Sequence, residues 1–211
     1  MKRCFLCFVF AVISILSVNA QEYKFPEPIK AVADSRNKTI EMILDYRFKG
    51  GHWAFQKLFY KNFVYPEAAR NACAIGISII NITVNCSGQL ENVVVKNSLG
   101  YGVELEIKKV LSLPEAEWNS CKDDKYTRFE IPILFVTQGT QTNRVDPYIV
   151  VEGENPGFVC KNDKYYWDRA VKYLKKKKGK KAISYLDILI KRNPMTTEFF
   201  EIKKQAIKMM K

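Results

Sequence analysis

The chain has a single histidine, His52, in 211 residues, and this scarcity limits the chemistry that the protein can perform. One imidazole cannot build a multi-histidine metal site, and no serine or cysteine lies in a motif typical of an activated nucleophile. Asp123-Asp124 are adjacent in a predicted turn, and consecutive side chains rarely converge on one substrate. The segment Gly100–Gly102 is too short for a phosphate-binding loop. The sequence therefore predicts a protein that is not an enzyme and that has no catalytic residue, cofactor or metal ion.

Long apolar runs are also scarce, and the most prominent one, Phe5–Val18, lies at the N-terminus. Lys2 and Arg3 precede this run and small residues up to Ala20 follow it, a pattern typical of a secretory signal peptide. The run is shorter than the roughly 20 apolar residues that cross a bilayer as a helix. We therefore expect residues 1–20 to be a signal peptide that is cleaved after Ala20, which predicts a periplasmic protein. The alternative is that Phe5–Val18 is retained as an inner-membrane anchor.

Acidic residues are scarce in the last quarter of the chain. The whole sequence carries 34 Lys and Arg against 22 Asp and Glu, a net charge of +12, and cleavage removes two basic residues and leaves +10. Residues 161–211 hold 16 basic against 5 acidic residues, a balance of +11, whereas 16 against 17 in residues 21–160 gives −1. A nearly neutral domain is thus followed by a strongly basic segment. We expect a linker over 138–162, where turn-forming residues gather: Gly139, Pro147, Gly153, Pro156 and Gly157.

The most β-prone stretch of the chain is Ile77–Val84, in which five positions are Ile or Val. Cys86-Ser87-Gly88 interrupts the β-branched run and Leu90–Val95 resumes it, which predicts a β-hairpin. A helix-period segment from Val103 to Leu111 follows, and then a third strand, Phe129–Val136. A short helix, Glu67–Ala72, is expected before the hairpin, so the predicted order of elements is helix, hairpin, helix and strand.

Four cysteines remain after residue 20, namely Cys73, Cys86, Cys121 and Cys160, and no two of them form a CxxC pair. An even number in an exported chain favours disulfides, and the sequence alone allows three pairings. The predicted topology narrows the choice, because the hairpin tip with Cys86 and the end of the helix before Cys121 lie at the same end of the sheet. Cys73 lies at the opposite end, where the chain leaves the third strand toward Cys160. We therefore predict the pairs Cys86–Cys121 and Cys73–Cys160, with free buried thiols as the alternative.

Residues 50–136 also resemble a known family in the order of their motifs. The stretch GGHWAFQKLFYKNFVYPEAA gives a helix that leads into Tyr65-Pro66, and a Gly-led strand and a turn ending at Gly88 follow. VVVKNSLGYG, a helix that closes near Trp118 and the strand FEIPILF complete the series. In this order and spacing, the chain resembles the C-terminal domain of the energy-transducing TonB family. The resemblance implies an α+β fold, a small three-stranded antiparallel sheet with two helices on one face.

Two features depart from the family pattern. Transducers of this family carry a membrane anchor and a long Pro-rich periplasmic spacer, whereas this chain has a predicted cleavable signal and no such spacer. The stretch SCKDDKY, residues 120–126, replaces the Gly- and Asn-containing turn that usually precedes the last strand. The first departure weakens the case for force transduction, and the second leaves the predicted fold unchanged.

In the TonB family, this domain binds the TonB box, a short segment of outer-membrane receptors of the Gram-negative envelope, by adding the extended peptide to an open sheet edge. Proline lacks an N–H and is most compatible with an edge strand, which fits an edge position for the last strand. The alternative is that this proline only protects an edge from aggregation, that the apolar side chains are core residues, and that the Tyr-Pro pair is a simple helix start. The resemblance implies a peptide-binding site on the last strand with two residues at its rim: Phe129, Glu130, Ile131, Pro132, Ile133, Leu134, Phe135 and Val136, with Tyr65 and Pro66.

The basic tail contains two helix-period stretches, Tyr165–Leu174 and Ala182–Ile190, which KKKKGKK separates. The second stretch resembles the back half of a tetratricopeptide repeat (TPR), and Thr196–Met210 is expected to form one more helix. One repeat cannot form the continuous core of an array, so we expect a helical hairpin plus an extra helix. The cluster Lys175–Lys181 is either a solvated turn or a site for an anionic membrane surface.

Three functional interpretations follow from these patterns. The first is a periplasmic TonB-like module that binds TonB-box-like peptides of outer-membrane receptors or other envelope proteins by strand addition. The second is a transducer that keeps its membrane anchor, and the third is an envelope scaffold that binds partners through its basic helical tail. Nucleic acid is not expected as a partner of an exported protein, and the sequence leaves a homodimer open. The expected organisation is a signal peptide, an N-terminal extension, the TonB-like domain, a linker and the TPR-like tail: 1–20, 21–49, 50–137, 138–162 and 163–211.

Overall fold

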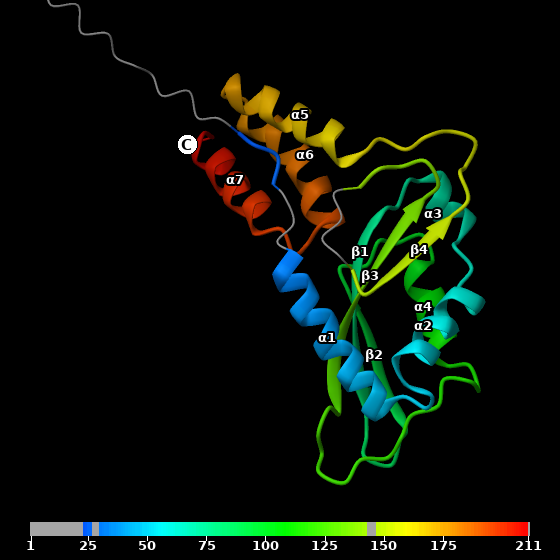
Figure 1. Cartoon of the computed structure of the whole chain (residues 1–211). Helices are drawn as coiled ribbons and strands as arrows, with labels where there is room; N and C mark the ends of the chain where they lie inside the picture. The colour runs from blue at the N-terminus through cyan, green and yellow to red at the C-terminus, as the bar shows by residue number, and fades with distance from the viewer. Residues whose placement is uncertain (1–22, 27–29, 143–146, 211) are drawn as a thin grey trace, which may run out of the picture.

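The computed structural model describes residues 23–26, 30–142 and 147–210, so the predicted signal peptide and its cleavage site lie outside the described residues. One four-stranded sheet carries helices, and a group of three further helices forms the C-terminal part of the chain (Figure 1). Among the described residues, no helix has both the length and the apolar character needed to cross a membrane. The elements in chain order are α1 (Lys30–Arg47), α2 (Gly51–Asn62), α3 (Glu67–Asn71), β1 (Gly76–Val84), β2 (Leu90–Lys96), α4 (Val103–Leu111), β3 (Arg128–Thr137), β4 (Ile149–Gly153), α5 (Asp163–Lys175), α6 (Gly179–Arg192) and α7 (Thr197–Lys208).

The strand order in the sheet is β2-β1-β3-β4. β1 pairs antiparallel with β2, which confirms the predicted hairpin. β1 also pairs antiparallel with β3 along most of its length. β4 pairs in parallel with the C-terminal half of β3. The prediction of an α+β fold is therefore correct, whereas the prediction of a three-stranded antiparallel sheet is wrong: the sheet is mixed and has a fourth strand.

The fourth strand comes from residues 138–162, the segment that we predicted to be a linker. Its sequence, IVVEG, begins with three β-branched residues, which fit the pleated surface of a sheet. The run is only five residues long, and Pro147 precedes it and Gly153 ends it. The turn-forming residues on both sides favoured the prediction of a linker, so this short strand was not predicted.

The main hydrophobic core lies between one face of the sheet and helices α1, α2 and α4. Ile80 and Ile82 of β1 point into this core, and alternate residues of β3 do the same. Phe48, directly after α1, packs edge to face against Phe55 of α2 and against Trp118, with ring centroids 5.2 and 4.9 Å apart. This aromatic cluster ties the two helices to the sheet and makes Trp118 a core residue.

The single histidine helps to fix the start of α2. Gly50, at the N-cap, has a φ of 83°, a left-handed conformation that glycine adopts without strain. Asp45 of α1 accepts a hydrogen bond from the backbone N–H of His52 at 2.9 Å and lies 2.7 Å from its ring Nδ1. These bonds hold the pKa of the Asp45 carboxyl below its ordinary value. His52 therefore lies in the first turn of α2 and links that helix to α1.

The basic tail folds as α5, α6 and α7 around a core of its own. Asn162 caps α5, because its side chain accepts a hydrogen bond from the backbone N–H of Tyr165 at 2.9 Å. Phe25, from the extended segment before α1, packs against Trp167 and Phe199, with ring centroids 5.7 and 6.3 Å apart. The first described residues therefore lie against the C-terminal helices.

The end of α6 packs closely against the start of β1, and the Arg192 side chain there ties α6 to α5. Its guanidinium lies 3.1 Å from the Asp163 carboxylate, and both side chains are almost completely buried. The side-chain amide of Asn193 donates to the other Asp163 oxygen at 3.0 Å. A Cβ on Gly76 of β1 would lie 2.6 Å from the Arg192 Cα, so this close approach requires glycine.

Both disulfides form in the predicted pairing. Cys86–Cys121 joins the hairpin tip to the segment before β3. Cys73–Cys160 joins the segment before β1 to the segment between β4 and α5. Disulfides form and persist in oxidising compartments, so they indicate an extracytoplasmic location.

Candidate functional site

The predicted peptide-binding strand, β3, lies in the interior of the sheet, with β1 on one side and β4 on the other. The expectation that Phe129–Val136 forms an open edge is therefore wrong for the half of β3 that pairs with β4, which begins at Ile133. The side chains of Phe129, Ile131, Ile133 and Phe135 are buried in the core, as the alternative interpretation predicted. Leu134 and Val136 are buried on the opposite face.

Pro132 is accommodated inside the sheet because of the direction in which its nitrogen points. Its carbonyl accepts a hydrogen bond from the backbone N–H of Tyr148 at 3.0 Å, so the polar groups of Pro132 face the β4 side. The N–H and C=O of one strand residue point to the same side. The missing N–H of Pro132 therefore costs nothing in the ladder between β3 and β1. The Pro132 nitrogen faces the β4 side, but it lies before the first pair of the β3–β4 ladder, Ile133 with Ile149.

The same alternation identifies which β3 groups hold β4. Counting from Pro132, the N–H groups of Leu134 and Val136 face β4, whereas those of Ile133 and Phe135 face β1. The backbone N–H of Gln138 donates to the carbonyl of Gly153 at 2.9 Å, so the polar groups of Gly153 face β3. By alternation along β4, the N–H groups of Ile149 and Val151 also face β3, whereas that of Val150 faces away.

β4 fills this edge with side chains as well as with backbone. Ile149 and Val151 are buried in the main core, while Val150 packs on the opposite face beside the Cys73–Cys160 disulfide. Alternating side chains thus anchor the strand on both faces of the sheet.

The connection between β3 and β4 is unusual for parallel neighbours. It runs from Gln138 to Tyr148, 11 residues, and contains no helix in its described part. Parallel strands are usually joined by a crossover of a dozen or more residues that includes a helix. β4 is therefore an extended segment laid on the edge of a three-stranded sheet, without a crossover helix of its own among the described residues.

Tyr65, predicted at the rim of the site, lies against the end of β4. Its ring packs on Gly153, where a Cβ would lie 2.8 Å from the Tyr65 Cγ. Its hydroxyl donates to the carbonyl of Ala74 at 2.9 Å, and its ring lies 6.1 Å from that of Phe135. Burial raises the pKa of the Tyr65 phenol far above its ordinary value. Pro66 is half-buried at the N-cap of α3.

Glu130 is the one exposed residue of the predicted β3 site, and it lies on the sheet face away from the main core. Its carboxylate forms an ion pair with Lys96 of β2 and accepts a hydrogen bond from the Asn81 side chain at 3.1 Å. Arg128 donates to the other end of the Asn81 amide at 3.1 Å. The hydrogen bond from Lys96 holds the pKa of Glu130 below its ordinary value, and Asn81 adds to this effect. Glu130 thus belongs to a polar network across three strands.

Three potential metal ligands converge at one place in the described part of the chain, at Cys86, Cys121 and Asp124. The two sulfur atoms are bonded to each other, and a sulfur must be a free thiolate to ligate a metal well. This group is therefore a disulfide beside an exposed carboxylate.

The residues that the sequence analysis missed are those of β4 and the preceding Tyr148. A signal for them existed: Ile149, Val150 and Val151 are consecutive β-branched residues. The scan against protein-family models and the searches of curated proteins and of solved structures found no match to this chain.

Proposed function

We propose that this protein is a non-enzymatic, periplasmic, TonB-like binding module that takes up extended peptide segments by adding them to the edge of β3. The partner is a TonB-box-like segment of an outer-membrane receptor or of another envelope protein. The observation that carries the proposal is the parallel pairing of β4 with Ile133–Thr137, because this edge already holds an extended segment, and the described part of its connection contains no crossover helix. β4 is then the chain's own occupant of the site, and the partner replaces it.

The contacts of β4 define what such a partner looks like. Its backbone donates to β3 through alternate N–H groups, which supply affinity without regard to sequence. The positions of Ile149 and Val151 require apolar side chains that fill the core, and the position of Gly153 requires a residue without a Cβ beside Tyr65. The preferred ligand is therefore an extended segment with β-branched residues at alternate positions and a glycine at its C-terminal end.

Replacement of β4 has a cost that the partner must offset. Withdrawing Ile149 and Val151 from the core costs about 1.5–3 kcal/mol for each side chain. As part of the same chain, β4 also competes at an effective concentration in about the millimolar range. A free peptide therefore binds the intact protein weakly, and it binds much more tightly once β4 is released.

A peptide with the sequence of residues 147–154, PYIVVEGE, tests this proposal against the variant Val151→Pro. Proline at position 151 removes an N–H that faces β3, so the variant is expected to release β4 while the rest of the sheet stays folded. Isothermal titration should show binding of the peptide to the variant and far weaker binding to the unaltered protein. Circular dichroism of the variant is the control for its fold.

Backbone N-methylation of the same peptide supplies a matched pair of ligands. Methylation at Val151 blocks an N–H that faces β3 and should weaken binding by about tenfold or more. Methylation at Val150 blocks an N–H that faces away from β3 and should leave binding nearly unchanged. Equal effects of the two methyl groups, or no binding of the unmodified peptide to a folded variant, would refute strand addition at this edge.

A further inference from the structure

The end of the tail that carries the turn between α5 and α6 has an uncompensated positive charge. Six lysines of this turn are exposed: Lys175, Lys176, Lys177, Lys178, Lys180 and Lys181. Lys208, near the end of α7, is exposed as well. We refer to these seven lysines as the basic pole.

The acidic side chains of the tail do not neutralise the basic pole. Four of the five acidic residues of the tail are paired with bases outside the pole. Among the described residues, none of the pole lysines forms an ion pair with a carboxylate. The four pairs are Asp163 with Arg192, Asp168 with Lys164, Asp187 with Lys203 and Glu201 with Lys204.

The fold brings exposed apolar side chains next to these lysines. Gly179 opens α6 in direct contact with the end of α7: an added Cβ would overlap the carbonyl oxygen of Ala206 and lie 2.9 Å from the Met210 Cγ. This close approach sets the lysine turn beside Ile207, Met209 and Met210, which are 39%, 39% and 51% exposed. Exposed lysines and a small apolar tip, formed by these three side chains, thus lie at the same end of the tail.

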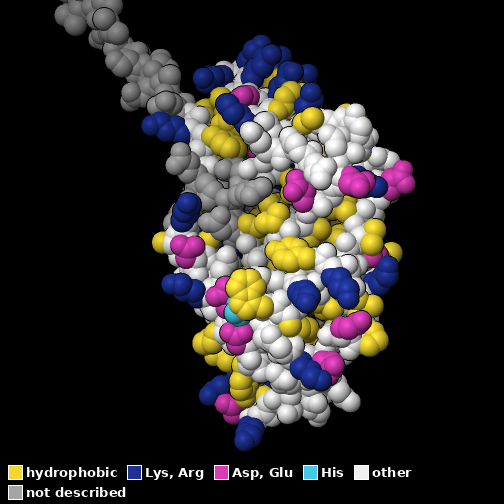
Figure 2. All heavy atoms as spheres, turned by 45° about the vertical axis from the view of Figure 1, so that its right-hand side comes forward, with side chains coloured by type: hydrophobic (Ala, Val, Ile, Leu, Met, Phe, Trp, Pro, Cys, Tyr) yellow, Lys and Arg dark blue, Asp and Glu magenta, His cyan; other side chains and the backbone are white. Residues whose placement is uncertain are grey.

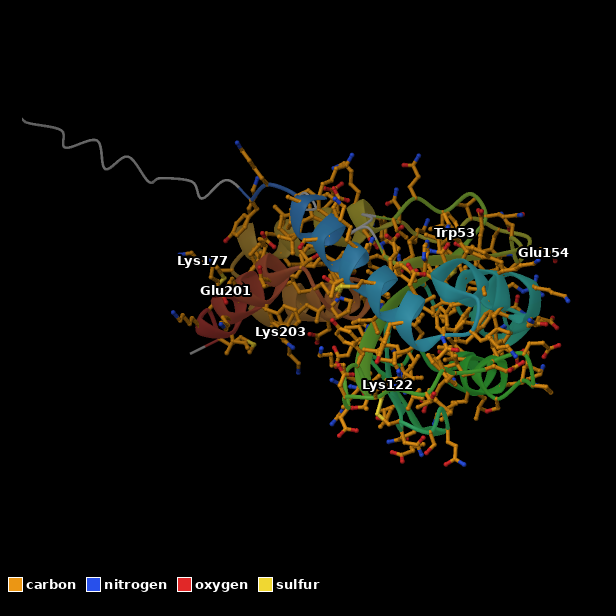
Figure 3. All side chains as sticks on the ribbon, turned by 60° about the horizontal axis from the view of Figure 1, so that its bottom comes forward. Trp53, Lys122, Glu154, Lys177, Glu201 and Lys203 are labelled. Atoms are coloured by element: carbon orange, nitrogen blue, oxygen red, sulfur yellow. A yellow bond between two sulfur atoms is a disulfide. The ribbon has the colours of Figure 1, made fainter. Side chains whose placement is uncertain are left out.

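The pole lies far from the sheet. Figure 2 shows Lys and Arg side chains gathered at the top of the molecule, whereas acidic and basic side chains alternate lower on the same face. Figure 3 shows Lys177 at one end of the molecule, with Trp53 of α2 and Glu154 toward the other end. A partner at the pole therefore does not compete for the β3 edge.

We infer that the basic pole is a docking surface for a membrane that contains anionic phospholipids. Lysines close to an anionic bilayer are attracted by its negative surface potential, and exposed apolar side chains among them enter the interfacial region. The apolar tip distinguishes this partner from a nucleic acid, which attracts the lysines but offers no place for methionine side chains. Docking at the pole would present the β3 edge away from the membrane surface.

Vesicle co-sedimentation tests the inference, with phosphatidylcholine vesicles that contain phosphatidylglycerol compared with pure phosphatidylcholine vesicles. The test variant changes Lys175, Lys176, Lys177 and Lys178 to Gln. The control variant changes four exposed lysines outside the tail to Gln: Lys38, Lys57, Lys61 and Lys122. Both variants lose the same charge, so they differ only in where the charge is removed.

The protein should sediment with the anionic vesicles and not with the neutral ones. Each pole lysine should contribute about fivefold to partitioning at low salt, so the test variant should bind at least about a hundredfold more weakly. The control variant should bind nearly as well as the unaltered protein. Equal losses in the two variants, or equal binding to both kinds of vesicle, would overturn the inference.

A second variant, Met209→Gln with Met210→Gln, separates a membrane from other polyanions. It keeps every charge and should weaken vesicle binding severalfold, while binding to duplex DNA stays unchanged. If this variant binds the vesicles as well as the unaltered protein does, the pole is a general polyanion site and the membrane inference fails. Both methionines are exposed, so thermal unfolding should be unchanged and serves as the control for folding.

Discussion

The backbone N–H of Tyr148 donates to the carbonyl of Pro132 at 3.0 Å, and this contact marks the point where β4 joins β3. Before this point, no strand of the described residues lies on the outer side of β3; after it, β4 follows β3 for five residues. Pro132 has no backbone N–H, and it lies just before Ile133, where the hydrogen-bond ladder between β3 and β4 begins. The junction thus divides β3 into two halves with different surroundings.

The first prediction concerns the contact between Gly153 and Tyr65. Gly153→Ala would place a Cβ 2.8 Å from the Tyr65 Cγ, so either the end of β4 or the ring must move. We expect the free energy of unfolding to fall by about 1–3 kcal/mol, the usual cost of overpacking. Urea unfolding measures the change.

The neighbouring residue Glu152 is exposed and supplies the control for that substitution. Glu152→Ala should change the free energy of unfolding by no more than about 0.5 kcal/mol. If the two substitutions have the same small effect, Tyr65 does not clamp the end of β4.

The second prediction concerns the buried pair Asp163 and Arg192. Asp163→Asn leaves the guanidinium buried without a charged partner, so we expect a loss of about 3–5 kcal/mol in the free energy of unfolding. Asp168→Asn breaks the exposed pair with Lys164 and should cost less than about 1 kcal/mol. Thermal unfolding of both variants separates the two cases, and a similar small loss in both would show that the buried pair between α5 and α6 is not a strong contact.

The third prediction compares the two disulfides. Cys73 and Cys160 are 87 residues apart, so loop entropy assigns this bridge roughly 4–5 kcal/mol of stability, against roughly 4 kcal/mol for the shorter loop of Cys86 and Cys121. The two bridges should differ more clearly in local protection. Only the first bridge holds the segment after β4.

Hydrogen exchange measures this difference. In a Cys73→Ser, Cys160→Ser variant, the amides that join β3 and β4 should exchange faster, while the amides between β1 and β2 keep their protection. A Cys86→Ser, Cys121→Ser variant should leave the amides of β4 unchanged. Faster exchange of β4 in the second variant, or none in the first, would contradict the role given to the bridge after β4.

The fourth prediction concerns pH and Glu130. Its pKa in the folded protein is lowered, so the ion pair with Lys96 stabilises the fold above the unfolded pKa of about 4.5. This contribution is lost as the pH falls through the lower folded value. Glu130→Gln should therefore reduce stability at neutral pH, and the difference from the unaltered protein should disappear in acid.

The size of that effect is limited by exposure. The Glu130 side chain is 46% exposed, so the contribution should stay below about 1 kcal/mol and decrease with added salt. Urea unfolding at a series of pH values tests both statements. A stability difference that persists unchanged at low pH would show that packing, and not charge, explains the substitution.

Part of this architecture can be predicted from local sequence patterns. The hairpin of β1 and β2 follows from two β-branched runs around Gly88, and the pairing of the cysteines follows from the order of the elements. The three tail helices cover the periodic stretches, because amphipathic spacing is a signal within each helix. These features depend on residues that are close in sequence or on the order of neighbouring elements.

The position of β3 in the sheet could not be predicted in the same way. Pro132 indicates that one side of the strand lacks a donor, but the sequence does not say which side, nor that Ile149–Val151 would cover it. The contact between Gly76 and Arg192 likewise joins residues far apart in the chain. Such long-range choices depend on which surfaces fit together, and local patterns do not encode them.

Amide exchange at four β3 positions tests the central claim most directly, since Leu134 and Val136 face β4 while Ile133 and Phe135 face β1. In the Val151→Pro variant, we predict that the amides of Leu134 and Val136 lose protection and that the peptide of residues 147–154 restores it. The amides of Ile133 and Phe135 should stay protected throughout. If the first two amides remain protected in the variant, or if the peptide fails to restore them, the edge of β3 is not a site for an added strand.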